Sequence, residues 1–166
     1  MIRYRSFKNS DAEEVSRLVK ETMLTTNIKD YSKEYVENDL KRLTAQDFKE
    51  RAKYFHCYVF IDDAVNKIIA VGSIGAYWGK KDEGSLFNIF VSPEYQGQGI
   101  GKRVIQVLEQ DEYFNRAKRI EIPSSITGLG FYQKMGCSFK NGQDALDDEQ
   151  LYRLEKFNKK AYDVES

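Results

Sequence analysis

The sequence predicts a mixed α/β domain with the segment order βααβββαβαββ, and two patterns carry this prediction. Between residues 55 and 91, three runs rich in aromatic and β-branched residues follow one another with short polar turns, which is typical of an antiparallel meander. After Pro93 the pattern changes to a glycine-rich loop, an apolar stripe at helical spacing and a further strand. Because a helix joins the strands at 85–91 and 118–122, we expect these two strands to run parallel in one sheet.

The N-terminal part is expected to hold one strand and two or three helices. Residues 2–7 alternate apolar and basic side chains, as a short strand does. Residues 9–11 offer N-caps for a helix with an apolar stripe. This stripe comprises Ala12, Val15, Leu18 and Val19. Ser32 can cap a second helix, and residues 45–53 are a plausible third.

The later elements follow in order along the chain. Strands are expected at residues 55–61, 68–78 and 85–91, then a helix from Ile100 that includes Leu108, and a strand at 118–122 that Pro123 ends. A helix at 126–135 is expected to stop at Gly136, because glycine is the usual residue just past a helix end. Strands at 138–139 and 151–157 close the predicted domain.

Composition indicates one globular domain over residues 1–166. The 26 basic and 26 acidic residues balance, so the whole chain gives no reason to expect a nucleic-acid partner or an anionic membrane. No run approaches the ~20 apolar residues of a membrane span, and the first residues lack a signal-peptide pattern. Cys57 and Cys137 are interpreted as reduced core thiols. We therefore expect a cytoplasmic protein, a monomer or homodimer, without a metal.

A glycine-rich turn at residues 96–101 is the strongest chemical signal. Gly97, Gly99 and Gly101 alternate where a strand gives way to a helix. Glycine permits positive φ and close ligand approach, and the first amides of a helix are free donors with partial positive charge. Together these features suit a diphosphate. A Walker loop does not fit because Arg103 follows Lys102 and position 96 is Gln rather than Gly. A Rossmann loop is disfavoured because the spacing is GxGxG rather than GxGxxG and three antiparallel strands precede it.

The run Gln96-x-x-Gly99-x-Gly101 resembles the coenzyme A signature of the GNAT superfamily of N-acetyltransferases. Val91-x-Pro93-x-Tyr95 is similar to the run that precedes this signature in the family. Phe131-Tyr132-Gln133-Lys134-Met135-Gly136 resembles its second landmark, an aromatic-Tyr-x-Lys-x-Gly run. The resemblance implies a GNAT-like acyl-CoA N-acyltransferase fold, whose central twisted sheet is splayed between two parallel strands.

The resemblance also implies acetyl-CoA as co-substrate, held mainly by backbone groups. The diphosphate would lie on the amides of residues 97–102, and the pantetheine arm would pair with the strand before the signature. Ser125 stands where the family often has an asparagine that contacts the cofactor. The implied cofactor-binding residues are Ile89, Phe90, Val91, Gln96, Gly97, Gln98, Gly99, Ile100, Gly101, Lys102, Ser125 and Tyr132.

For the chemistry, the resemblance implies direct attack of an amine on the thioester via a tetrahedral intermediate, with Tyr132 as general acid. A thiol with a pKa of ~8.5 is a stronger acid than tyrosine at ~10, so Tyr132 would help mainly through a hydrogen bond. The general base stays open between Glu121, Glu83 and a water chain. Each glutamate could instead be structural.

Three functions stay open from the sequence. The acceptor is a primary amine on a small molecule or amino acid, or alternatively a protein N-terminus or lysine; a third possibility is a catalytically silent acetyl-CoA-binding module. In the family, acceptor choice comes from the loops that correspond to residues 25–31 and 143–150. The second loop is acidic and could attract a cationic amine, while Tyr77 and Trp78 could line a pocket.

Overall fold

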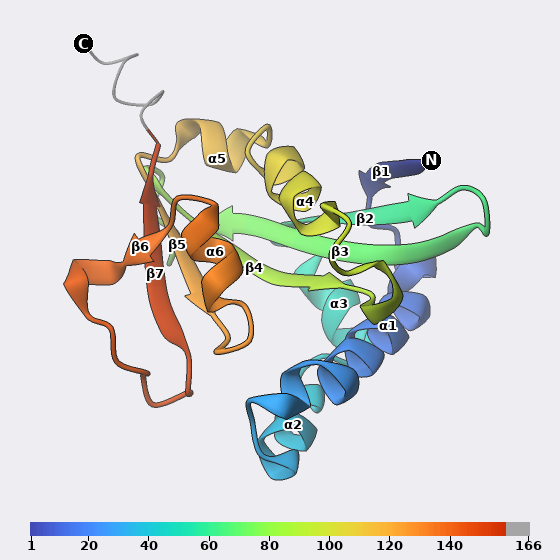
Figure 1. Ribbon diagram of the computed structural model, residues 1–166. Helices are drawn as coiled ribbons and strands as arrows, with labels where there is room; N and C mark the ends of the chain where they lie inside the picture. The colour runs from blue at the N-terminus through green and yellow to red at the C-terminus, as the bar shows by residue number, and fades with distance from the viewer. Residues whose placement is uncertain (159–166) are drawn as a thin grey trace. The chain divides into compact units, whose positions relative to one another are not determined.

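The computed structural model describes residues 1–158 and divides the chain into two compact units. Unit 1 comprises residues 1–73 and 88–105, and unit 2 comprises residues 74–87 together with the chain from residue 106 onward. The strands β3 and β4 contribute to both units (Figure 1). The single domain over residues 1–166 stays a prediction, and its last eight residues lie outside the described part of the chain.

Hydrogen bonds order the strands β1-β2-β3-β4-β5-β7-β6 in a seven-stranded mixed sheet. The elements of unit 1 are β1 (Ile2–Ser6), α1 (Ala12–Thr25), α2 (Lys33–Leu40), α3 (Ala45–Arg51) and β2 (His56–Asp62). The strands shared by the units are β3 (Lys67–Ala76) and β4 (Glu83–Val91), and α4 (Ile100–Leu108) begins in unit 1. Unit 2 adds α5 (Glu112–Arg116), β5 (Arg119–Ser124), α6 (Leu129–Lys134), β6 (Ser138–Phe139) and β7 (Tyr152–Phe157).

Local sequence signals explain how the helices of unit 1 begin. The Ser32 hydroxyl accepts a hydrogen bond from the amide of Tyr35, which confirms the predicted cap of α2. Thr44 and Asp47 form a reciprocal capping box at the start of α3. The predicted stripe of α1 is buried, because helical spacing gathers those side chains on one face. Its buried residues are Ala12, Val15, Leu18, Val19, Thr22 and Met23.

Unit 2 contains the predicted parallel strand pair, and this pairing is short. Parallel β4 and β5 pair from Glu83 opposite Arg119 to Ser85 opposite Glu121, and the ladder ends there although both strands continue. Further along β4, Asn88 has φ 51, in the left-handed region that is uncommon in a strand interior. The short pairing agrees with the strand separation that the resemblance implies.

Several boundaries differ from the sequence predictions. The strand β5 continues through Pro123, which was expected to end it; its ladder with β4 has already ended at Glu121, so the missing amide breaks no bond on that side. The helix α6 begins at Leu129 rather than residue 126, because residues 125–128 form a turn closed by Ser125. The short helix α5, capped by the Asp111 side chain, was not predicted.

The sequence also predicts that the chain has no membrane-spanning segment. Within residues 1–158, no helix combines the length and the apolar character needed to cross a membrane.

Candidate active site

The site residues predicted from the sequence divide between the two units. The glycine-rich turn and the second half of β4 belong to unit 1, whereas Tyr132, Ser125 and the two candidate bases belong to unit 2. Each group forms a defined arrangement within its own unit.

In unit 1 the glycine-rich turn uses the conformations that only glycine adopts readily. Gly97 has φ 76 and Gly99 has φ 79, in the left-handed region that strains other residues. A Cβ atom added at either position would meet nothing within 4 Å. The space beside these two residues is therefore open, and a ligand can approach the backbone closely.

Several main-chain amides of this turn have no acceptor among the described residues. Within residues 1–158, no acceptor contacts the main-chain amides from Gly97 to Lys102, and the first backbone bond of α4 runs from the Arg103 amide to the Gly99 carbonyl at 3.2 Å. These amides form the positive end of a nine-residue helix. Their open environment fits a diphosphate group, as the sequence predicts.

Hydrogen bonds made by the Gln96 and Gln98 side chains stabilise the glycine-rich turn. The Gln96 Nε2 atom donates to the Val91 carbonyl at 3.1 Å and lies 3.3 Å from the Thr26 hydroxyl, while Gln98 reaches back to the Glu94 carbonyl at 3.4 Å. These two glutamines therefore hold the loop itself in shape. Their contacts keep the side chains off the amides.

The segment between β4 and the turn is anchored by two further contacts. The Ser92 amide donates to the Ile69 carbonyl at 2.8 Å, and the Tyr95 hydroxyl donates to Asp62 at 2.5 Å. The hydrogen bond to Tyr95 lowers the pKa of Asp62, so this carboxylate is ionised when it accepts. Sequence reasoning placed Tyr95 in a motif without finding this bond, which joins positions far apart in the chain.

In unit 2, Tyr132 lies on α6 and is buried. Burial raises the pKa of Tyr132 well above the ordinary tyrosine value, and the nearby Cys137 adds to the effect. The hydroxyl therefore stays protonated through the physiological range and can act only as a hydrogen-bond donor or a weak acid.

The absence of a side chain at Gly128 leaves room for the Tyr132 ring, a role that the sequence alone did not indicate. A Cβ at Gly128 would lie 3.2 Å from the Tyr132 ring and 3.2 Å from the Ser125 hydroxyl, closer than ordinary contact. The Ser125 hydroxyl itself accepts from the Gly128 amide at 3.0 Å. The cofactor contact of Ser125 stays a prediction, and its hydroxyl already closes this turn.

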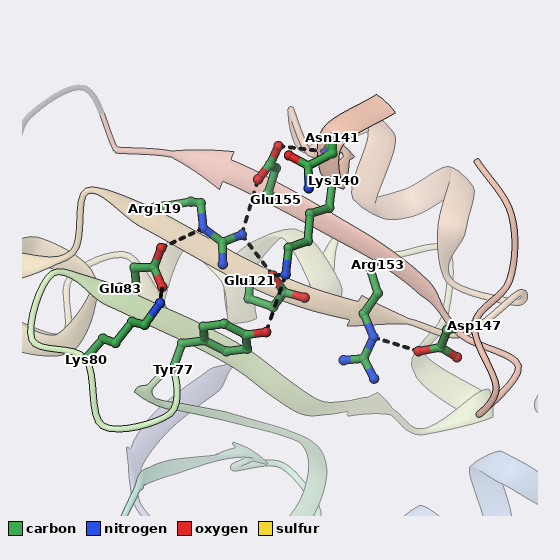
Figure 2. A network of polar contacts seen from close by, with 10 residues as sticks. All are labelled: Tyr77, Lys80, Glu83, Arg119, Glu121, Lys140, Asn141, Asp147, Arg153 and Glu155. Atoms are coloured by element: carbon green, nitrogen blue, oxygen red, sulfur yellow. Dashed lines mark hydrogen bonds and ion pairs between the residues drawn. The ribbon is translucent and has the colours of Figure 1, made fainter. Parts of the chain in front are cut away.

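The two candidate bases belong to one ion-pair network on a single face of the unit 2 sheet (Figure 2). Arg119 is its centre: Nη1 donates to Glu121 Oε1 at 2.8 Å, and Nε donates to Glu83 Oε1 at 3.1 Å. Lys140 approaches the same Glu121 oxygen at 3.1 Å, and Arg119 also donates to Glu155 at 3.2 Å. Three strands thus contribute carboxylates to one guanidinium.

Glu83 is unsuited to accept a proton. Burial alone would raise its pKa, but Arg119 and then Lys80 outweigh burial and hold the pKa of Glu83 below the usual range. In both glutamates the buried Oε2 has no hydrogen-bond partner within residues 1–158. They differ because Lys80 lies 3.4 Å from Glu83 Oε2, whereas Arg119 and Lys140 both pair with Glu121 Oε1 and leave its Oε2 without an ion pair. Glu121 is therefore the candidate with an oxygen left for another group.

The network borders an open hollow of about 590 Å³ on unit 2. Its lining includes Tyr77 and Trp78, which the sequence analysis named as possible pocket residues, beside charged members of the network. Trp78 is 85% exposed and holds φ 51, an unusual conformation for a bulky residue. Arg119 and Lys140 both lie over the Tyr77 ring, at 5.3 and 5.2 Å from its centre.

The acidic loop at 143–150 is less available than its sequence suggested. Asp147 accepts from Arg153 Nε at 2.7 Å and from the amides of Glu149 and Leu151 at 2.9 Å each. Burial opposes ionisation of Asp147, but the Leu151 amide and Arg153 outweigh it and hold its pKa low. This aspartate therefore shapes the loop, and Arg153 offsets its charge.

No metal centre is evident in the described part of the chain. Within residues 1–158, no three His, Cys, Asp or Glu side chains form a group that could hold a metal ion. Cys57 and Cys137 are unpaired, and burial raises the pKa of each thiol to about 11. Both are therefore protonated at neutral pH, unlike reactive thiolates.

Comparisons with solved structures identify the fold. PaiA N-acetyltransferase from Thermoplasma acidophilum, crystallised in complex with coenzyme A, matches with a TM-score of 0.79 and 17% identity over 95% of this chain and 99% of that one. A GCN5-related N-acetyltransferase from Rhodopseudomonas palustris matches with a TM-score of 0.75 and 17% identity over 94% and 95%. An acetyltransferase of the GNAT family from Streptococcus pneumoniae gives 0.70 and 18% over 95% and 99%.

Comparisons by sequence give a match to a family model but no curated relative. No curated protein matches this chain. The model of the Acetyltransferase (GNAT) family matches residues 20–137, a stretch that includes the glycine-rich turn and Tyr132. Since this match covers most of the sequence and the fold agrees with it, the chain belongs to the Acetyltransferase (GNAT) family.

Proposed function

We propose that this chain transfers an acetyl group from acetyl-CoA to a primary amine of a small molecule or amino acid. The observation that carries the proposal is the row of main-chain amides from Gly97 to Lys102, which have no acceptor within residues 1–158 and face open space at Gly97 and Gly99. Such a row at a helix start binds a diphosphate through hydrogen bonds and the helix dipole. Coenzyme A carries this group.

The chain's own residues divide the work of holding the co-substrate. The amides of residues 97–102 would bind the diphosphate, with Lys102 and Arg103 adding cationic charge. The backbone of Ile89, Phe90 and Val91, at the end of β4, would pair with the pantetheine amides. When bound, acetyl-CoA supplies an acyl group activated as a thioester.

Tyr132 would assist departure of the thiol by donating a hydrogen bond from its hydroxyl to the sulfur. Because burial keeps this hydroxyl protonated, it is ready to donate at neutral pH. Full proton transfer would be uphill, since the thiol is the stronger acid, so the benefit lies in a hydrogen bond that strengthens as charge develops on sulfur.

Glu121 is the better of the two candidate bases. Arg119 and Lys80 already engage the carboxylate of Glu83. Glu121 keeps its Oε2 without a partner, and a carboxylate oxygen of this kind can hydrogen-bond the acceptor amine and receive its proton directly or through water.

A coupled assay tests the proposed function. The purified chain is mixed with acetyl-CoA and a panel of small amines, amino acids and peptides, and free thiol is measured together with the mass of the acetylated product. We expect thiol release that depends on both the chain and an amine. Tight acetyl-CoA binding without thiol release from any amine would contradict catalysis and favour a silent binding module.

A further inference from the structure

Two buried carboxylate oxygens of the Arg119 network, Glu83 Oε2 and Glu121 Oε2, have no hydrogen-bond partner within residues 1–158. Lys80 lies 3.4 Å from Glu83 Oε2 as an ion pair, so Glu121 Oε2 is the one with neither a hydrogen bond nor an ion pair among the described residues. Glu121 is 1% exposed, and its Oε2 has no hydrogen-bond partner within residues 1–158. A buried carboxylate oxygen without a donor is costly, because it has lost water without gaining a substitute. A donor supplied by a ligand would remove this cost.

The surrounding carboxylates are already matched by cations or amides. Glu155 accepts from Arg119 at 3.2 Å and from the Asn141 amide at 3.4 Å. Glu83 is held by Arg119 at 3.1 Å and pairs with Lys80 at 3.4 Å. The three glutamates face the three cations Lys80, Arg119 and Lys140, so this cluster is formally neutral. Within residues 1–158, the carboxylate oxygen of this cluster that has neither a hydrogen bond nor an ion pair is Glu121 Oε2.

Arg153 offers the complementary charge on the neighbouring strand. Its Nε is tied to Asp147 at 2.7 Å, and its Nη2 lies 3.5 Å from Glu149, at the outer limit of a hydrogen bond. No acceptor within residues 1–158 contacts its Nη1. In Figure 2 the terminal nitrogens of the guanidinium point away from Asp147. The contact to Asp147 therefore holds the side chain in place while leaving donors exposed on its other edge.

The register of β5 and β7 places these two groups on the same face. Glu121 lies opposite Glu155, and Arg153 lies opposite Pro123. Side chains two residues apart on a strand share a face, so Glu121 and Arg153 are diagonal neighbours, about 7–8 Å apart along the sheet. Both side chains are long enough to contact opposite ends of one small ligand.

From this juxtaposition we propose that the acceptor is an α-amino acid, whose ammonium group binds Glu121 Oε2 and whose carboxylate binds Arg153. The inference rests on the proposed function and specifies its substrate class. A zwitterion satisfies both groups and leaves the neutral cluster neutral. A polyamine would bring several ammonium groups to a cluster whose cations already balance its carboxylates. A simple amine would leave the Nη1 donor of Arg153 without an acceptor.

Matched acceptors test this proposal without any change to the protein. Each of a set of α-amino acids is compared with its amide and with the amine that lacks the carboxyl group, and kcat/KM is measured by thiol release. A charged hydrogen bond is worth about 1.5–3 kcal/mol, so the amino acid should be favoured about 10- to 100-fold over both analogues. Equal or faster turnover of the analogues would overturn the inference while leaving acetyl transfer intact.

Arg153 variants locate the preference within the protein. Arg153→Gln should raise KM for the amino acid more than KM for its amide, so that the ratio of the two kcat/KM values falls at least tenfold, and Arg153→Lys should restore part of that ratio. Damage to the loop around Asp147 would instead slow both acceptors equally, which would count against recognition. Arg42→Gln, which removes an exposed arginine of unit 1, is the matched control. Absence of thiol release with every acceptor would overturn the proposed function and this inference with it.

Discussion

At Gly99 the backbone holds φ 79 beside open space, and Gly79 in the β3–β4 loop holds φ 72 under the same conditions. An alanine at either position carries the same left-handed backbone cost, about 1–2 kcal/mol. Only Gly99 belongs to the proposed diphosphate turn. We predict that Gly99→Ala weakens acetyl-CoA binding at least tenfold, which is about 1.4 kcal/mol, whereas Gly79→Ala loses similar stability with unchanged binding. Calorimetric titration with thermal unfolding distinguishes the two effects.

Also at the scale of single residues, removing the Tyr132 hydroxyl should lower kcat rather than the affinity for acetyl-CoA. Tyr132→Phe keeps the buried ring but loses the hydrogen-bond donor to the departing sulfur, so kcat should fall about 10- to 100-fold. The KM for acetyl-CoA should change little, because the proposed cofactor contacts are mainly backbone groups elsewhere. An unchanged kcat in the phenylalanine variant would remove Tyr132 from the mechanism.

Burial of Tyr132 also predicts how stability depends on pH. Its pKa in the folded chain is raised above the unfolded value of ~10, so the folded state holds the proton more tightly. The stabilising contribution is complete below pH ~10 and is lost as pH rises toward the folded pKa. Denaturant unfolding between pH 8 and 11 should show a steeper decline for the wild type than for Tyr132→Phe. Parallel curves would contradict the burial effect.

At the scale of helices and strands, the sequence predicted features set by a few neighbouring residues better than features that depend on strand pairing. Ser32 as a cap and Gly136 with φ 91 as a stop were readable because each acts within a few residues of its own helix. The network around Arg119 was not readable, because it needs the register of β4, β5 and β7, which no short stretch of sequence specifies. Glu121 was accordingly named as a possible base without its partners.

Arg119 also ties these strands energetically. Its side chain is 13% exposed and faces Glu121, which is 1% exposed. Removing one partner leaves a buried charge uncompensated, so Arg119→Gln should destabilise the chain by about 3–5 kcal/mol. The control is Arg3→Gln, whose exposed pair with Asp63 should contribute less than about 1 kcal/mol. Equal effects of the two variants on the free energy of unfolding would contradict a structural role for the network.

At the scale of the whole molecule, the sequence predicted the family and the general fold, since the glycine turn and the Tyr132 run are contiguous motifs. It did not predict the acceptor, because residues such as Glu121 and Arg153 come together only through strand pairing. The family match, the short parallel ladder and the open amides of unit 1 support our central proposal, that this chain binds acetyl-CoA through the backbone of residues 97–102.

Titration calorimetry of the purified chain with acetyl-CoA tests that claim most directly. We predict saturable binding of one molecule per chain, with competition by coenzyme A and marked weakening in Gly99→Ala. Absence of binding at millimolar acetyl-CoA by a chain shown to be folded, or equal affinity in the wild type and Gly99→Ala, would contradict it.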